Sequence, residues 1–362
     1  MITDSKELEA YREPWEALRT ECRCSRFLSF DLASLWLEVY DDFEPRVLVV
    51  EDHGEVVGIA PLALRRRSVA GIPVRTLSFI GDDRGRLGLD TNMMLVRQGR
   101  SDVMDQLVAG IDDIDWNSMW MYYMEDIDTT HQLMDGIRSR WRYHEYPPDS
   151  TITLTIPSTG KVLGNLKRNR RHNIERRIRR VEEEHDVSYR EVTESGIEAA
   201  AEVYARQHIE RWRDRGGSLF QDPRNVRFLG QAMKYALANG FGYGYELLVD
   251  GEVAAQTFGY IDGDLAKSYR IGMNDAYANY SPGMVLLNFK LSSLRDRGCT
   301  ALDLSVTGDG DYKQHFGGVP GRLRGIAASR GLASLLTWAA TFAPIDRLSG
   351  LSRGKQKAPV EE

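Results

Sequence analysis

One local pattern occurs twice in this chain, and it limits the possible folds more than any other feature. In each half a stretch of apolar residues at helical spacing is followed by two apolar runs joined by a short turn. The first pair of runs is joined at residues 52–54 and the second at residues 250–251, and the tripeptide Gly-Glu-Val begins at Gly54 and again at Gly251. Helices that alternate with β-hairpins are typical of an α/β protein.

Other segments extend this alternation in both halves. Strands are predicted where apolar residues alternate or form short runs, and helices where they recur every three or four residues. The predicted strands are 75–80, 93–96, 118–123, 151–156, 266–272 and 301–305, and the predicted helices include 32–39, 101–111, 129–139, 195–212 and 284–297.

The length of 362 residues exceeds the size at which one hydrophobic core keeps growing. We therefore expect two domains, residues 1–150 and 151–330, followed by a segment of residues 331–362. That segment opens with the apolar run of residues 331–345, which is shorter than the roughly 20 residues of a membrane-spanning helix. It is predicted to be a buried helix with a polar tail. The alternative is a helix on a membrane surface, anchored by Trp338 and Phe342.

The charge and cysteine content indicate a cytoplasmic protein. The formal net charge of −6 disfavours a general DNA-binding role. Residues 1–9 carry several charges and no apolar core, which excludes a secretory signal. Three cysteines are too few for a disulfide framework, and no cluster of cysteine and histidine predicts a metal site.

A strongly basic segment is predicted as an amphipathic helix over residues 161–181. Nine Lys or Arg residues between positions 161 and 180 accompany one acid, Glu175. Such an excess favours an anionic partner: a phosphate-bearing cofactor, an anionic sugar donor, a lipid headgroup or RNA. A solvated helix with paired charges is the alternative. Lys167, Arg168 and Arg171 are candidate anion- or substrate-binding residues, together with His315 of a later loop.

A second candidate site lies at the start of the helix 284–297. Ser281 and Gly283 precede it directly, and helix N-termini bind phosphate or carboxylate through backbone N–H groups and the helix dipole. A glycine there lets a ligand approach the backbone. Ser281, Gly283, Met284 and Val285 are therefore candidate cofactor-binding residues, the alternative being a simple helix cap.

A third candidate is the glycine-rich loop after the strand 301–305. Asp303 stands in that strand, and Tyr312, Lys313 and His315 stand in the loop. Loops at strand ends often present reactive groups. A lysine beside tyrosine and histidine can neutralise an oxyanion or phosphate, or transfer a proton. A polar surface loop is the alternative.

Taken in order, these motifs resemble the FemAB-like or CelD-like branch of the GNAT acyltransferase superfamily. The segment Lys313-x-x-Phe316-Gly-Gly318 is also similar to one in Fem-type peptidoglycan aminoacyl ligases. The matching segments are residues 15–18, 30–36, 58–62, 81–90, 165–171, 253–254, 280–283, 298–303 and 312–313.

The resemblance implies two tandem GNAT-like domains, with mixed central sheets flanked by helices and an acyl-transfer site in the second. It places a donor acyl-CoA on the backbone of residues 281–285, with Arg270 on an anionic group. Lys313 would meet the acceptor or the oxyanion charge, and Tyr269, Asp303 and Tyr312 would handle protons. Residues 280–283 lack the usual Q/R-x-x-G-x-G/A consensus for coenzyme A. Fem-type relatives take their acyl group from aminoacyl-tRNA instead.

Three functions follow from the sequence. The first is N- or O-acyl transfer from acyl-CoA to an amino sugar, polysaccharide precursor or other cell-envelope metabolite. The second is an aminoacyl-tRNA-dependent ligase, in which the basic helix contacts tRNA. The third is a non-catalytic scaffold or polysaccharide-binding subunit. Convergence of Tyr269, Asp303 and Lys313 on one cleft would favour an enzyme.

Overall fold

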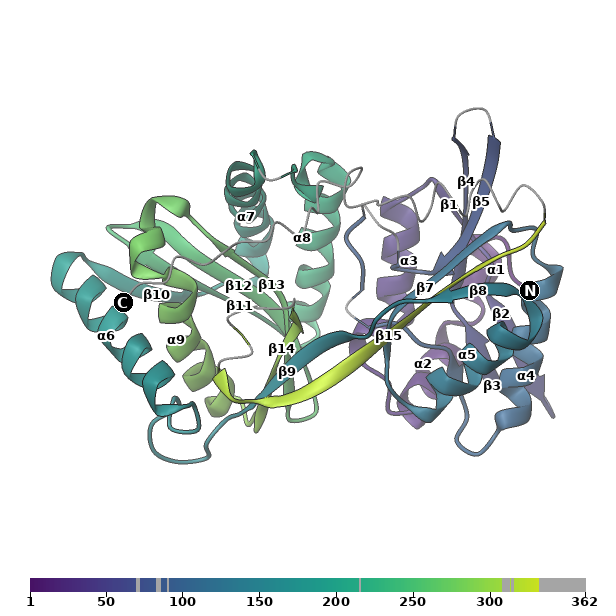
Figure 1. Ribbon diagram of the computed structural model, residues 1–362, viewed down its shortest axis with the longest axis horizontal. Coiled ribbons are helices and arrows are strands. Elements are labelled where there is room, and N and C mark those ends of the chain that lie inside the picture. Colours follow the sequence, from purple (N-terminus) through teal and green to yellow (C-terminus); the bar gives the residue numbers. More distant parts are fainter. Residues whose placement is uncertain are drawn as a thin grey trace.

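The computed structural model of the chain has a mixed α/β fold in two lobes (Figure 1). It describes residues 1–69, 72–82, 86–89, 91–214, 216–307, 313 and 316–331. The predicted helix and tail of residues 331–362 therefore lie outside the described residues, apart from Gly331. None of the helices within the described ranges is long and apolar enough to span a membrane.

The first lobe contains the predicted hairpin and helices. Trp15 and Leu18 on one helix and Trp36 on another are each at most 1% exposed, because their apolar faces meet in one core. The elements are α1 (Ser5–Glu9), α2 (Arg12–Glu21), η1 (Arg26–Leu28), α3 (Phe30–Val39), β1 (Phe43–Pro45), β2 (Leu48–Asp52), β3 (Glu55–Ala60), β4 (Leu62–Val69), β5 (Ile72–Phe79), β6 (Leu95–Val96), α4 (Ser101–Gly110), η2 (Ile111–Asp113), β7 (Ser118–Glu125), α5 (Asp128–Arg140) and β8 (Arg142–Glu145).

The second lobe follows the same alternation of helices and strands. Its elements are β9 (Asp149–Thr155), α6 (Arg168–Glu184), β10 (Val187–Glu191), η3 (Glu194–Gly196), α7 (Ile197–Trp212), η4 (Leu219–Gln221), α8 (Pro223–Ala238), β11 (Gly242–Val249), β12 (Glu252–Asp262), β13 (Leu265–Met273), η5 (Asp275–Tyr280), α9 (Pro282–Asp296), β14 (Ala301–Thr307) and β15 (Val319–Ser329). Helices α7 and α8 cover one face of the strands and α9 covers the other (Figure 1).

The strands of both lobes join in one large mixed sheet. Within the described residues its order is β1-β4-β5-β7-β15-β9-β14-β13-β12-β11-β10, while β2, β3 and β6 form a separate sheet. Strand β15 connects the lobes, because its first residues pair with β9 and its last residues pair with β7 (Figure 1). The two predicted hairpins therefore occupy different settings: β2–β3 lies in the small sheet and β11–β12 in the large one.

The basic helix is shorter at its start than the sequence predicted. We expected a helix over residues 161–181, but α6 begins at Arg168 and continues to Glu184. The preceding residues form turns, in which the N–H of Gly164 donates to the carbonyl of Lys161 (2.8 Å). Gly160 has φ +75°, a left-handed conformation that a helix does not accommodate. Two glycines within five residues therefore delay the helix.

Candidate active site

Two neighbouring strands of the second lobe separate partway along their length. β13 and β14 run parallel and pair only from Leu265 and Ala301 to Lys267 and Asp303. Beyond that last pair, β13 continues to Met273 and β14 to Thr307 without pairing to each other. We call residues 268–273 and 304–307 the fork. Beyond this point the facing backbone edges of the two arms are not paired with each other.

The open end of the β13 arm leads through η5 into the N-terminus of α9. Ser281 has a left-handed backbone (φ 51°, ψ 60°) and precedes the helix, and its carbonyl accepts hydrogen bonds from the N–H groups of Met284 (2.8 Å) and Val285 (3.3 Å). A Cβ added at Gly283 would meet no atom within 4 Å. The helix start therefore has open space over Gly283, as a backbone anion site requires. The side chain of Val285 is buried in the core.

A chain of polar side chains stands next to this helix start. His185 lies between Asp250 (Nδ1 to Oδ2, 2.7 Å) and the hydroxyl of Tyr280 (Nε2 to Oη, 3.0 Å). The Tyr280 hydroxyl also donates to Glu184, and that hydrogen bond lowers the pKa of the Glu184 carboxyl, as does the one from Arg180. This network fixes the end of α6 against the residue before Ser281.

Asp303 lies at the base of the fork and lines a cavity between the lobes. Its Oδ1 accepts a hydrogen bond from the N–H of Ser305 (2.8 Å), which has a left-handed backbone (φ 62°). The cavity measures about 230 Å³. Glu125 and Asp126 at the end of β7 also line it, together with Arg322 of β15. Residues from both lobes thus surround the candidate Asp303.

Lys313 is also placed at the fork. Its Nζ donates to the carbonyls of Leu304 and Val306, both at 2.9 Å, so the ammonium lies against the β14 arm. The other two candidates of this loop, Tyr312 and His315, lie outside the described residues.

Tyr269 and Arg270 take a different direction. The Tyr269 hydroxyl donates to the carbonyl of Gly88 in the first lobe (2.6 Å), and its ring packs against Phe27. The guanidinium of Arg270 lies 4.1 Å from the centre of the Tyr269 ring. Arg270 also affects His208 of α7. Burial is the main cause that lowers the pKa of His208 to about 4, and the nearby charges of Arg270 and Arg211 add to it. The structure thus brings Asp303 and Lys313 together at the fork, while Tyr269 joins the contact between the lobes.

The basic candidates lie where α6 begins. The N–H of Lys167 faces the carbonyl of Phe316 (3.5 Å), and a Cβ at Gly317 would come within 3.0 Å of the Lys167 side chain. Arg171 donates to the carbonyl of Gly164 (3.3 Å), and Arg168 is exposed. The start of the basic helix therefore packs against the segment that follows Lys313.

One charged residue beside the fork was missed from the sequence. Lys290 of α9 is 2% exposed, and its Nζ donates to the hydroxyl of Ser268 (2.7 Å) on the β13 arm. The sequence did contain a sign of this burial. Lys290 lies four residues after Leu286 and four before Leu294, on the apolar face of the helix. A lysine is rarely fully buried in a protein unless a partner group compensates its charge.

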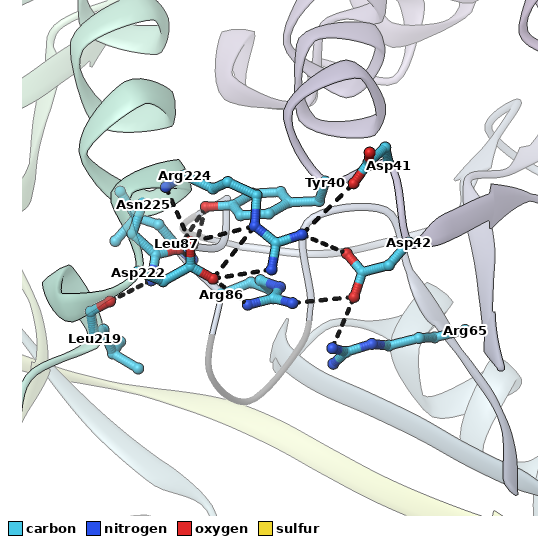
Figure 2. Close-up of polar contacts among 10 residues, drawn as sticks. All are labelled: Tyr40, Asp41, Asp42, Arg65, Arg86, Leu87, Leu219, Asp222, Arg224 and Asn225. Carbon is cyan, nitrogen blue, oxygen red and sulfur yellow. Dashed lines mark hydrogen bonds and ion pairs between the residues drawn. The ribbon is translucent and has the colours of Figure 1, made fainter. Parts of the chain in front are cut away.

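A polar network holds the first lobe against the second next to this site (Figure 2). Arg86 pairs with Asp222 at the start of α8 (2.6 Å) and with Asp42 of the first lobe (3.0 Å). Arg224 pairs with the same two carboxylates (2.9 and 3.1 Å). Leu87 follows Arg86, and its N–H donates to Asn225 (2.9 Å). The segment that carries Gly88 is thus fixed beside Tyr269.

Comparison with known proteins identifies the second lobe. The family model "Acetyltransferase (GNAT) domain" matches residues 168–314, which include the fork and the start of α9. No curated protein matches the chain in sequence.

Two solved structures share the fold of nearly the whole chain. FemX aligns with a TM-score of 0.58 at 10% identity, over 90% of this chain and 96% of FemX. L-PGS from Bacillus licheniformis aligns with a TM-score of 0.54 at 12% identity, over 94% of this chain and 96% of that protein. The expected GNAT-like fold is thereby confirmed. The match of residues 168–314 to a GNAT acetyltransferase domain supports an acyltransferase enzyme.

Proposed function

We propose that this acyltransferase moves an acyl group from acyl-CoA to an amine or hydroxyl acceptor, an amino sugar, polysaccharide precursor or other cell-envelope metabolite. The observation that carries the proposal is the fork between β13 and β14, whose β13 arm leads into the open N-terminus of α9. An extended donor can pair with a free strand edge while its phosphates meet backbone N–H groups at the helix start.

Residues of both lobes can receive the acceptor. The cavity that Asp303 lines opens between β7, β9, β14 and β15, so an acceptor within it would lie next to the base of the fork. There the acceptor nitrogen or oxygen attacks the acyl carbonyl, and the acceptor proton passes to a base such as Asp303. The carbon–sulfur bond breaks, and the leaving thiolate takes up a proton.

Charge at the fork supports such a reaction. The carbonyl oxygen gains negative charge as the acceptor attacks, and preorganised donors stabilise that charge best in a site with little water. Lys313 is the candidate for this role, because its half-buried ammonium already lies on the β14 arm. Positioning and this stabilisation would supply most of the rate enhancement.

A second candidate function is aminoacyl transfer from aminoacyl-tRNA. Two observations favour it: the similarity to FemX and the basic start of α6 at Lys167 and Arg168, next to Phe316. Binding of tRNA would weaken steeply with salt, because bound phosphates release counterions.

Calorimetric titration with acetyl-CoA, free coenzyme A and tRNA at two salt concentrations tests the proposal. We expect saturable one-to-one binding of acetyl-CoA. It should be weakened at least about tenfold in Gly283→Phe, which fills the space over the helix start, and much less in Gly283→Ala, a control that adds only one methyl group. Salt-sensitive tRNA binding without any response to coenzyme A would establish the second candidate. No binding of any of the three would favour a scaffold.

A further inference from the structure

Lys290 is a charged residue at a position that the fold reserves for apolar side chains. It lies on the face of α9 that packs on the sheet, and its side-chain neighbours along the helix are Leu286, Leu287, Leu291 and Leu294, all buried. Burying an ammonium group away from water costs several kcal/mol unless other groups compensate. Lys290 therefore needs either strong partners or a function.

The partners of Lys290 are neutral. Its Nζ donates to the hydroxyls of Ser268 (2.7 Å) and Thr257 (3.3 Å) and lies 5.2 Å from the centre of the Tyr243 ring. Among the described residues, no carboxylate lies within 4 Å of this ammonium, since no ion pair of Lys290 is found there. Two hydroxyls and an aromatic face compensate a buried charge only in part.

The position of Lys290 relative to the fork is specific. Ser268 is the first residue of the β13 arm after Lys267, where pairing with β14 ends. Lys313 binds the β14 arm through its backbone, at the carbonyls of Leu304 and Val306. One lysine thus binds each arm just beyond the point where the strands separate.

The charges at the base of the fork act on one another. Burial first, and then the positive charge of Lys313, lower the pKa of Lys290 to about 7, while the carboxylate of Asp303 opposes this shift. Three titratable groups therefore face Lys290 in the described chain: Asp303 of β14, Lys313 after it, and the phenol of Tyr243 on β11. The geometry agrees with this influence: Lys290 binds Ser268, which follows the partner of Asp303 in the sheet, and Lys313 binds the carbonyl of Leu304, the residue after Asp303.

We propose that Lys290 is a positioning residue of the acyl-transfer site, which with Asp303 and Lys313 forms one charge-coupled group at the base of the fork. This inference rests on the proposed function. The ammonium orients the Ser268 hydroxyl and places positive charge beneath the position where the acyl oxygen becomes negative. It acts through the β13 arm and does not contact the substrate, because its Nζ is covered by Ser268 and Thr257.

Only the charged form of Lys290 supplies this stabilisation. Because the pKa of Lys290 is about 7, the lysine loses its proton around neutral pH. The rate of the chemical step should therefore fall as pH rises through about 7. A lysine kept only for packing would show no such effect, because its removal would change stability without changing the pH profile.

Two measurements test the proposal. The first follows the Nζ resonances of ¹⁵N-lysine-labelled protein against pH, without any ligand. One amine should titrate near 7 and be absent from Lys290→Met. Lys313→Met should raise the pKa of that amine because a like charge is removed, and Asp303→Asn should lower it. The control Lys234→Met removes an exposed lysine that pairs with Glu198, and it should leave the amine unchanged.

The second measurement is the release of coenzyme A from acetyl-CoA in the presence of a panel of amine and hydroxyl acceptors, between pH 6 and 9. Lys290→Met should lower kcat about 10- to 100-fold, leave the KM for acetyl-CoA within about twofold, and abolish the loss of rate near pH 7. Ser268→Ala keeps the Lys290 amine and removes one of its hydrogen-bond partners. It should lower kcat less than Lys290→Met does, and it replaces Lys290→Met in the test if that variant does not fold.

The outcomes distinguish the proposed acyl-CoA donor from the proposed role of Lys290. If the wild-type protein transfers nothing from acetyl-CoA, the proposed donor is wrong, and the lysine titration alone decides the role of Lys290. An amine that titrates near 10, or one that ignores Lys313→Met and Asp303→Asn, would overturn the coupled group. An unchanged pH profile in an active, folded Lys290→Met would overturn the positioning role.

Discussion

Replacement of Arg86 by Met should weaken the contact between the two lobes more than any exposed change at the same contact. The Arg86 side chain is 10% exposed and forms ion pairs with Asp222 and Asp42 on opposite sides of the contact. Arg227 offers a matched control, because it also joins α8 to the first lobe, through Glu38 (2.7 Å). The Arg227 side chain is 52% exposed, so its ion pair lies in water.

The expected magnitudes follow from this difference in burial. Removing one partner of a buried ion pair costs about 3–5 kcal/mol because a buried charge is left behind. Here Arg224 still pairs with both carboxylates, and Arg65 pairs with Asp42, so we expect about 2–3 kcal/mol for Arg86→Met. An exposed pair contributes roughly 0–1 kcal/mol, so Arg227→Met should cost less than about 1 kcal/mol.

The loss of unfolding free energy in Arg86→Met should also depend on pH. Burial alone would raise the pKa of Asp42. The hydrogen bond from Arg86 and the charges of Arg65, Arg86 and Arg224 outweigh this effect, so the pKa of Asp42 is lowered overall. A hydrogen bond from Arg224 lowers the pKa of Asp222. A carboxyl whose pKa is depressed on folding stabilises the folded state above its unfolded pKa of about 3.9. That stabilisation is lost as pH falls through the folded pKa.

Urea denaturation at pH 7 and at pH 3 measures both effects. The difference in unfolding free energy between wild type and Arg86→Met should be largest at pH 7 and should shrink at pH 3. Equal costs for Arg86→Met and Arg227→Met at pH 7 would refute the reasoning. A pH-independent difference would show that Arg86 acts through packing on Tyr40 and not through its charge.

Three further changes have definite expected outcomes. Gly283→Ala should change the unfolding free energy by less than about 1 kcal/mol, as judged by urea denaturation, because its Cβ meets open space at a helix start. The pKa of Lys290 lies below that of an unfolded lysine, so the unfolded chain binds more protons and stability rises with pH above 7. Lys290→Met should remove about 1.4 kcal/mol of that rise per pH unit between pH 7.5 and 9.5, and parallel stability curves would contradict this. The pKa of His208 is about 4, so wild-type stability should fall between pH 6.5 and 4; His208→Gln should remove roughly 1–2 kcal/mol of that fall in thermal unfolding.

Most helices and strands of the chain follow from local sequence periodicity. The hairpins at residues 46–62 and 245–256, the helix after Ser281 and the strand that carries Asp303 were all predicted and are present. Local patterns suffice there because each element buries one face against its immediate neighbours. The fork, by contrast, is a property of two strands, and no local pattern in β13 or β14 shows where their pairing ends.

Two features could not be predicted because their causes lie far away in sequence. Strand β15 alternates only weakly, since it contains Gly321 and Gly325, and pairing with β7, β8 and β9 makes it a strand. Tyr269 was assigned a role in proton transfer, yet its hydroxyl meets the carbonyl of Gly88, 181 residues away. For Lys290 a local signal did exist, a charge within an apolar stripe, but only the fold reveals that Ser268 lies at the fork.

The two lobes must act as one unit if the proposed site is correct. The cavity beside Asp303 is closed on one side by Glu125 of β7, which Lys267 holds with an ion pair of 3.0 Å. Lys267 itself belongs to the last pair of β13 with β14, so the base of the fork is tied directly to the first lobe. The family match covers residues 168–314 only, which omits both Glu125 and β15. The proposed acyl-transfer site would therefore depend on the first lobe for one wall of its acceptor cavity, and the specificity for the acceptor should lie at the contact between the lobes.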